Sequence, residues 1–209
     1  MAYALEGSVF IAGAAIQWLR DGLGLLPRAA DSETMARSLD DNGGVCFVPA
    51  LVGLGAPHWV PEARGAVFGL SRGTTKEHLV RAGLEAMAYG TAEVLRAMEA
   101  DSGLVTRELR VDGGAALNDW LMQFQSDVLD IPVRRPALVE TTALGAAGLA
   151  GLSVGVWPNA EAFLSCQGDP SRFNPDMPAE ERDALLAAWA RAVASVVGWA
   201  AKGHVGGGA

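Results

Sequence analysis

A strand-to-helix turn built around two glycines, Gly113-Gly114, most constrains how this chain can fold. A strand-like run, Leu109 to Val111, precedes the turn, and a helix is expected from near Ala115. Glycine permits unusual backbone angles and lets a ligand approach the main chain without a Cβ in the way. A helix beginning here would direct unpaired N–H groups and its positive dipole end toward a phosphate. The turn therefore has two interpretations, a nucleotide-binding turn or a β–α corner that binds nothing.

The elements that follow favour an α/β fold. After the turn, helical spacing continues through Val128, and Ile131 to Arg135 is again strand-like. This β–α–β order implies parallel strands joined by a right-handed crossover. A small-residue helix over 143–154, which should be buried, and a last amphipathic helix, Ala179 to Lys202, complete this half.

The first half of the chain contains helices and short strands. The run 3–10 could form a strand, and from Gly13 the apolar residues keep helical spacing. Thr74 lies three residues before Glu77, a capping-box signature for a helix that should end near Ala100. Three further elements are expected: a short acidic helix over Asp31–Asp41 and strands over Val45–Leu51 and Ala66–Leu70.

Composition excludes several kinds of partner. The chain has 209 residues and a net charge of −8, which argues against nucleic-acid binding because phosphate contacts need clustered Lys and Arg. The most basic interior spot is the pair Arg134-Arg135. No Cys-x-x-Cys unit occurs, and the three histidines are scattered, so no metal ligand is assigned.

The chain is expected to be cytoplasmic and to have no membrane partner. The N-terminus lacks a basic region followed by an apolar run, so it does not read as a secretory signal. The longest apolar run, Ala143 to Pro158, is shorter than the roughly 20 residues that a membrane-spanning helix needs.

Several blocks taken together resemble the glycerol kinases, which belong to the carbohydrate kinases of the actin-like ATPase superfamily. The resemblance extends from Tyr3 to about Trp199, and a C-terminal signature of the family spans Gly65 to Glu85, with Gly83 where a larger residue is usual. The blocks are Tyr-Ala-Leu-Glu-Gly-Ser-Val-Phe (3–10), Gly-Leu-Gly-Ala-Pro-His-Trp (53–59), Arg-Gly-Ala-Val-Phe-Gly-Leu-Ser-Arg-Gly (64–73), Arg-Val-Asp-Gly-Gly-Ala (110–115), Leu-Met-Gln-Phe-Gln-Ser-Asp (121–127) and Thr-Ala-Leu-Gly-Ala-Ala (142–147).

The resemblance implies a fold. It predicts an α/β, incomplete actin-like (ribonuclease H-like) ATPase domain with a parallel β–α–β core and flanking helices. Residues 1–202 would be the C-terminal nucleotide-binding domain of a glycerol kinase with its first strands missing. The tail 203–209 would be disordered.

The resemblance also implies ATP-dependent phosphorylation of glycerol to sn-glycerol 3-phosphate, with Mg²⁺. The residues that match the family's nucleotide contacts are Gly113 and Gly114 against the nucleotide, Asn118 near the adenine, and Gly13 and Gln17. From the residues alone, the expected interpretation is that Gly13 permits a close contact between helices and that Gln17 is a solvated side chain. Asp112 could touch the water shell of the metal or could cap the turn.

The same resemblance places the remaining machinery upstream. In the family, an Asp-x-Gly-Thr phosphate loop, the glycerol-binding residues and the general-base Asp precede the point that matches Tyr3. No catalytic residue is therefore assigned, and the chain alone is expected to be inactive. Glycerol would bind only with the missing N-terminal portion. Glycerol kinases commonly form dimers or tetramers, which implies a possible homo-oligomer.

Two other functions stay open from the residues. Gly69-Leu-Ser-Arg-Gly73 follows a predicted strand and matches the Gly-x-Ser-x-Gly elbow of serine hydrolases of the α/β type. Such an enzyme needs a histidine downstream of Ser71, where only His78 and His204 occur. The third hypothesis is a non-catalytic remnant that binds no nucleotide.

Overall fold

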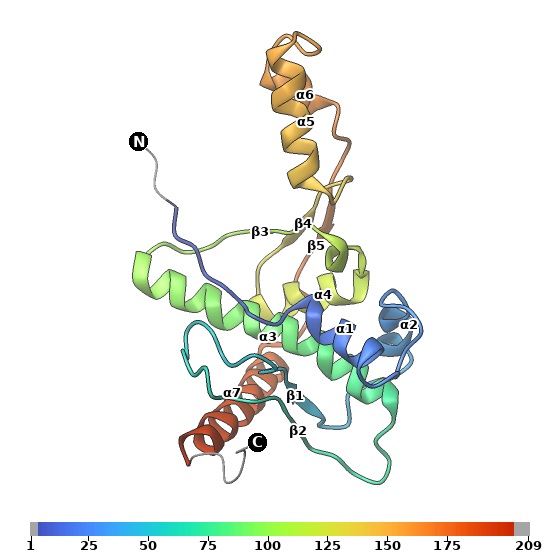
Figure 1. The fold of residues 1–209 in the computed structure, drawn as a ribbon, viewed down its shortest axis with the longest axis vertical. Coiled ribbons are helices and arrows are strands. Elements are labelled where there is room, and N and C mark those ends of the chain that lie inside the picture. The colour runs from blue at the N-terminus through green and yellow to red at the C-terminus, as the bar shows by residue number, and fades with distance from the viewer. Residues whose placement is uncertain (1–3, 203–209) are drawn as a thin grey trace, which may run out of the picture. The chain divides into compact units, whose positions relative to one another are not determined.

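The computed structural model describes residues 4–202, which form two compact units. Unit 1 combines the described residues up to Val105 with those from Asp176 onward, and unit 2 spans Thr106–Pro175. Both contain helices and a small sheet (Figure 1). The predicted tail 203–209 and the first residue of the run 3–10 lie outside the described part of the chain.

Unit 1 is organised around a 27-residue helix, α3 (Lys76–Ser102). Helices α1 (Gly13–Asp21) and α2 (Asp31–Arg37) pack on it, as does strand β1 (Cys46–Val48), which pairs antiparallel with β2 (Ala66–Phe68). The last helix, α7 (Ala179–Ala201), packs on β1. The helices and strands expected for this part of the chain are present. The strand expected before α1 is absent from residues 4–12, which have no regular structure.

Both ends of α3 have capping residues, one position away from the predicted start. The N-cap is Thr75, and His78 closes the capping box by accepting a hydrogen bond from the Thr75 backbone N–H at 3.1 Å. The pairing predicted between Thr74 and Glu77 is therefore wrong by one residue, because an imidazole nitrogen takes the place of the carboxylate. At the other end, Gly103 adopts φ +69°, a left-handed conformation that terminates the helix.

A buried polar network joins α3 to the segment before β1. The Glu85 carboxylate is only 3% exposed and accepts hydrogen bonds from Arg81 Nε at 3.0 Å and from Asn42 Nδ2. Arg81 also donates from Nη1 to the Leu39 carbonyl at 2.6 Å. Burial raises the pKa of Glu85 to about 7, although Arg81 and Asn42 oppose this shift. The network therefore gives each oxygen of this buried carboxyl group a donor.

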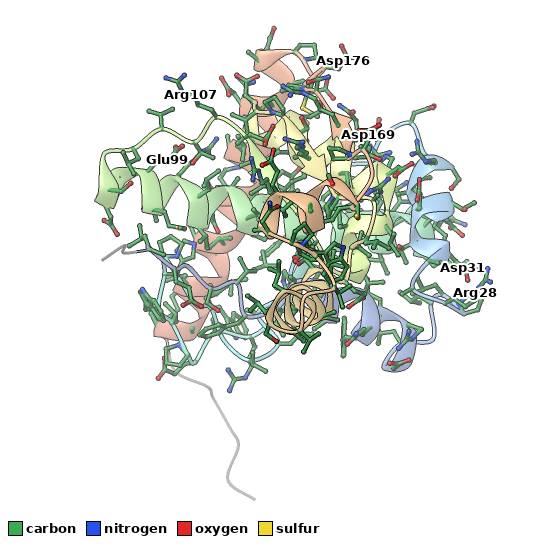
Figure 2. All side chains as sticks on the ribbon, turned by 90° about the horizontal axis from the view of Figure 1, so that it is seen from above. Arg28, Asp31, Glu99, Arg107, Asp169 and Asp176 are labelled. Atoms are coloured by element: carbon green, nitrogen blue, oxygen red, sulfur yellow. The ribbon has the colours of Figure 1, made fainter. Side chains whose placement is uncertain are left out.

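Ion pairs at the surface of unit 1 are of a different kind. Arg28 and Asp31 lie side by side at the start of α2, with Nη2 and Oδ1 2.6 Å apart (Figure 2). The Arg28 side chain is 78% exposed, so solvent screens this contact. Such a pair adds little to stability, in contrast to the buried Arg81–Glu85 pair.

Unit 2 contains the predicted parallel β–α–β core. Strands β3 (Leu109–Arg110) and β4 (Val133–Arg135) pair in parallel, and α4 (Asp119–Leu129) connects them and packs on β4. A third strand, β5 (Ser171–Phe173), pairs antiparallel with β4. Strand β5 was not predicted, because its three residues, two exposed and one partly buried, are too few to show a period.

The small-residue helix, α5 (Thr141–Ser153), is not the buried helix that was predicted. Its buried residues are Gly148 and Gly151, whereas Leu149 is 73% exposed. The two glycines lie under aromatic rings, since an added Cβ would come within 2.4 Å of Phe163 and 2.2 Å of Trp157. Phe163 belongs to α6 (Ala160–Ser165), a short helix that was not predicted. The small residues thus accommodate aromatic side chains rather than a sheet.

One described helix, α7, has the length and apolar composition that a membrane span would need. Length and composition are the whole of this evidence, and the core helices of soluble proteins meet the same criteria. Trp189, Val193 and Val196 of α7 are buried within unit 1. They give α7 an apolar face that packs within the fold.

Candidate nucleotide-binding site

The double glycine forms an open turn after β3. Gly113 has φ +77°, in the left-handed region that favours glycine, and its N–H donates to the Val139 carbonyl at 2.8 Å. A Cβ built on Gly113 or Gly114 would meet no atom within 4 Å. Backbone geometry therefore requires glycine at 113. At 114, packing within the chain does not require it, and the main chain is open to a ligand.

The helical segment after the turn is interrupted. Residues Gly114–Leu117 form a short 3-10 helix, η1, and α4 begins only at Asp119. Asn118 between them has ψ 104° and is the N-cap of α4, since its Oδ1 accepts from the Leu121 N–H at 2.9 Å. The prediction of one helix from near Ala115 is therefore wrong. The positive end of the α4 dipole therefore lies at Asn118, which caps the helix, and is followed by the acidic Asp119. The helix dipole consequently does not favour a phosphate at Gly114.

Arg135 fixes the turn to the sheet. From β4 it donates through Nη1 to the Ala116 carbonyl at 2.8 Å and to Asp119 Oδ1 at 2.6 Å. Its guanidinium lies 5.3 Å from the centre of the Phe173 ring, and the side chain is 15% exposed. The sequence showed only a basic pair with Arg134. Side chains alternate along a strand, so the two arginines point to opposite faces and serve different purposes.

Asp112, next to the double glycine, binds a hydroxyl. Its Oδ2 accepts a hydrogen bond from Thr141 Oγ1, at the first residue of α5. Asp112 thereby joins the turn to the start of α5. This contact favours a role for Asp112 in holding the turn over a role near a metal ion. Within residues 4–202, no group of three or more His, Cys, Asp or Glu residues lies close enough to hold a metal ion. The described side chains therefore do not by themselves build a Mg²⁺ site.

The other two predicted contacts lie in unit 1, on α1. Gly13 is the first residue of this helix and Gln17 follows one turn later, exposed to solvent. No atom lies within 4 Å of a Cβ built on Gly13, so the alternative that Gly13 permits a close helix contact is wrong. The buried face of α1 consists of Ala15, Ile16 and Leu19. Gly13 and Gln17 thus belong to one unit, and Gly113, Gly114 and Asn118 belong to the other.

Gly83 of α3 determines how closely α1 packs. A Cβ at this position would lie 2.8 Å from Leu19 Cδ1 and 3.2 Å from Ile16 Cδ1. The unusual glycine in the family signature therefore has a local explanation, because it makes room for the side chains of Leu19 and Ile16. It also fixes the helix that carries Gly13 and Gln17.

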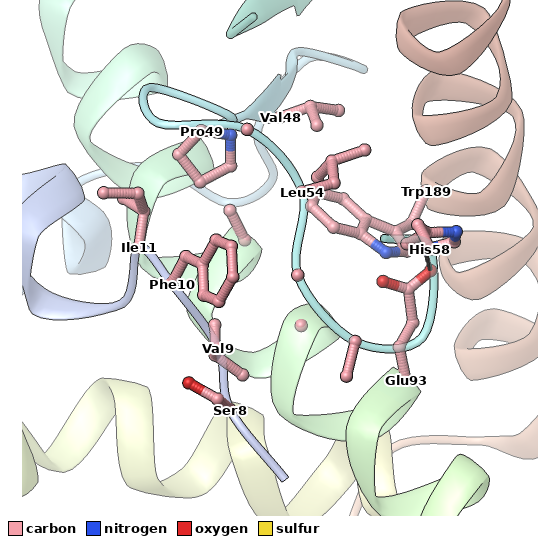
Figure 3. A pocket seen from close by; sticks show the side chains of 15 residues that line it. Ser8, Val9, Phe10, Ile11, Val48, Pro49, Leu54, His58, Glu93 and Trp189 are labelled. Atoms are coloured by element: carbon pink, nitrogen blue, oxygen red, sulfur yellow. Dashed lines mark hydrogen bonds and ion pairs between the residues drawn. The ribbon is translucent and has the colours of Figure 1, made fainter. Parts of the chain in front are cut away.

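Two cavities described in unit 1 are each too small for a nucleotide. One of them measures roughly 50 Å³ and lies beside His58 and Glu93, whose Nε2 and Oε1 atoms are within hydrogen-bond distance at 3.1 Å (Figure 3). Phe10, Leu54 and Trp189 line it, and this volume suits a few water molecules. Trp189 Nε1 is buried without a hydrogen-bond partner among the described residues. A larger cavity, of about 580 Å³, lies in unit 2 beside Asp112.

The serine of the hydrolase-like motif is not paired with histidine. Ser71 Oγ accepts a hydrogen bond from the Gly73 N–H at 3.2 Å and lies 3.5 Å from Thr74 Oγ1. His78 Nδ1 is engaged in the cap of α3, 2.9 Å from Thr75 Oγ1. The motif therefore forms the turn that precedes α3, and no described histidine activates the serine.

A family model identifies the class of protein. The family model for the FGGY family of carbohydrate kinases, C-terminal domain, matches residues 1–154, so the chain belongs to this family. Solved structures of the family confirm the expected actin-like ATPase fold, here as a partial domain. A xylulose kinase from Rhodospirillum rubrum, for example, is 25% identical, superposes with a TM-score of 0.73 and covers 93% of this chain and 40% of its own.

Within the family, the chain is similar to the C-terminal portion of glycerol kinases. The glycerol kinase of Xanthomonas campestris pv. campestris strain 8004 is 55% identical over 197 residues, covering 94% of this chain and 40% of that protein. For Brevibacillus brevis glycerol kinase the identity is 57% with the same coverage. The structure of Plasmodium falciparum glycerol kinase with ADP is 33% identical, with a TM-score of 0.83, covering 93% of this chain and 39% of that one. The chain thus spans about 40% of the length of these relatives.

Proposed function

We propose that this chain is the ATP-binding, C-terminal part of a cytoplasmic glycerol kinase, which converts ATP and glycerol to ADP and sn-glycerol 3-phosphate with Mg²⁺. One observation carries the proposal. Curated glycerol kinases are 55–58% identical to the chain over 91–95% of its length. The ADP bound to the Plasmodium falciparum enzyme supports an adenine nucleotide as the ligand.

In this proposal, the main chain at Gly113 and Gly114 lies against the nucleotide and Asn118 lies near its adenine. Gly13 and Gln17 supply two further contacts. The open space around Gly13, Gly113 and Gly114 supports these roles, since nothing in their own unit fills the position of a Cβ. Asn118 Oδ1 is used as an N-cap, so its amide nitrogen is the atom that would face the base.

The acceptor side of the reaction is proposed to come from the N-terminal part of such a kinase. That part would supply the phosphate loop, the glycerol-binding residues and the general-base Asp. Phosphoryl transfer depends on positioning the nucleophile and on neutralising the phosphate charge, and Mg²⁺ bound to ATP supplies part of that neutralisation. The share of its relatives that the chain spans, about 40%, supports this division of labour. The 209-residue chain is then inactive alone.

Nucleotide binding is tested by isothermal titration of the chain with ATP. We expect weak binding that is lost in Gly114→Val, because a branched side chain would occupy the space left for the ligand. No atom lies within 4 Å of this Cβ, so the variant should fold normally. Asn118→Asp is the matched variant for the adenine contact, since aspartate retains the cap but lacks the amide donor. Equal binding by all three chains would contradict the assigned site, and binding by none would favour a remnant.

Catalysis is tested by following sn-glycerol 3-phosphate formation. The chain with ATP, Mg²⁺ and glycerol should form none above a control without protein. Addition of the N-terminal portion of a related glycerol kinase should restore activity if the two parts assemble. Turnover by the chain alone would contradict the proposed division.

A further inference from the structure

Three arginines lie side by side on one face of the unit 2 sheet. Arg110 of β3 is paired in register with Arg134 of β4, and Arg134 is paired with Arg172 of β5. Residues in register on neighbouring strands point to the same face, with the strands about 4.8 Å apart. We call this set the arginine row. The opposite face carries the apolar residues that share the register: Leu109, Val133 and Phe173.

The arginine row shares a single carboxylate, that of Glu108. Its Oε1 lies 3.2 Å from Arg110 Nε and 3.9 Å from Arg134 Nη1, and its Oε2 lies 3.8 Å from Arg172 Nη1. Three positive charges against one negative charge leave a surplus of two, on a chain whose net charge is −8. Like charges at paired positions repel, so an anion bound at the arginine row would relieve this repulsion.

Two members of the arginine row, Arg110 and Arg134, line the 580 Å³ cavity of unit 2. A cavity of this size suits a small molecule. The fork of an arginine guanidinium matches the oxygens of a phosphate group. The other polar residues that line the cavity can pair with hydroxyl groups: Asp112, Thr141 and Gln167.

We propose that this cavity binds the phosphate monoester of a small hydroxylated molecule. Arg110 and Arg134 hold the phosphate, while Asp112, Thr141 and Gln167 face the hydroxylated body. Every one of these residues belongs to unit 2, so the site is complete within that unit. The site differs from the double glycine, and its existence does not depend on the proposed kinase function.

The test is calorimetric titration of the 209-residue chain with glucose 6-phosphate as the probe. Glucose 6-phosphate should bind, inorganic phosphate should bind more weakly, and glucose should not bind. Arg110→Gln and Arg134→Gln should each lower the affinity about 10-fold or more, the effect of losing a charged hydrogen bond in a cavity. The matched control is Arg172→Gln, which removes a charge from the same row outside the cavity and should change affinity less than about 3-fold.

Folding controls, a conservative variant and competition with ATP complete the test. Circular dichroism and thermal unfolding establish that each variant folds, and Arg110→Lys, which keeps the charge without the fork, should bind with intermediate affinity. Saturating ATP should leave binding of glucose 6-phosphate unchanged. Absence of binding at millimolar probe, equal binding by Arg110→Gln and the native chain, or displacement by ATP would each overturn the proposal.

Discussion

The two units of this chain place their charged groups differently. In unit 1, Glu85 is 3% exposed, and each of its carboxylate oxygens accepts a hydrogen bond from a residue of the same unit. In unit 2, the side chains of the arginine row are 43–79% exposed and share a single acid. Buried charge needs internal partners, whereas exposed charge can be satisfied by water or by a ligand. The buried Glu85 network of unit 1 therefore stabilises the fold, whereas the arginine row of unit 2 is open to solvent.

The largest expected effect comes from breaking the buried pair of unit 1. Arg81→Leu should lower the free energy of unfolding by about 3–5 kcal/mol above the pKa of Glu85, because it leaves a buried carboxylate without its cation. Urea denaturation followed by circular dichroism measures the change. The matched control is Arg37→Leu, which removes an exposed pair with Glu33 on α2 and should cost less than about 1 kcal/mol. Similar losses in the two variants would refute the contrast between buried and exposed charge.

Glu85 should also make the stability of unit 1 depend on pH. Its pKa is about 7 in the folded chain against 4.5 as the ordinary value, so between these values the folded state binds more protons than the unfolded state. Stability contributed by the protonated form is therefore complete below pH 4.5 and falls as pH rises through about 7, by roughly 3 kcal/mol in all. Arg81 and Asp41 are the charged groups that influence Glu85, and Tyr89 lies nearby with a raised pKa.

Unfolding experiments over this pH range test the linkage directly. Glu85→Gln should lose most of the slope, since glutamine does not titrate. A native chain whose stability is flat between pH 4.5 and 7 would contradict the buried position of the charge. A slope that survives in Glu85→Gln would originate outside this network.

The sequence predicted elements well where a long period or a special residue marked them. The 27-residue α3 repeats its apolar stripe over several turns, and it ends at Ser102, close to the predicted end near Ala100. The parallel pairing of β3 with β4 followed from chain order alone. Short elements failed for the same physical reason, because three residues of β5 and six of α6 complete too few periods to be recognised.

The candidate site was predicted in part. The turn at the double glycine was predicted because two adjacent glycines between a strand-like run and a helical run mark a turn. Arg135 was missed because its partners, Ala116 and Asp119, lie 19 and 16 residues away and are brought close only by the fold. The arginine row was missed for a related reason. Pairing of Arg110, Arg134 and Arg172 depends on the register of three strands, which no local pattern encodes.

The glycines of α5 give a smaller effect that sharpens the contrast within unit 2. Gly151→Ala should destabilise the packing of α5 by about 1–3 kcal/mol, because the new Cβ would lie 2.2 Å from the Trp157 ring. Gly145→Ala in the same helix meets no atom within 4 Å and should stabilise by up to about 1 kcal/mol through helix propensity. The midpoint temperatures of thermal unfolding of the two variants should therefore shift in opposite directions. Equal shifts would mean that Trp157 does not cover Gly151.

The smallest effect separates the structural and binding roles of Asn118. Asn118→Ala should cost about 1 kcal/mol, because the Leu121 N–H loses its acceptor at the start of α4, whereas Asn118→Asp should cost almost nothing since aspartate is as good an N-cap. Amide hydrogen exchange at Leu121 and Met122 reports the cap without reference to ATP. If Asn118→Asp keeps protection at these amides yet loses ATP binding, the amide nitrogen serves the ligand and the oxygen serves the helix. If protection and binding fall together, Asn118 acts only through the position of α4, and its place near the adenine has to be given up.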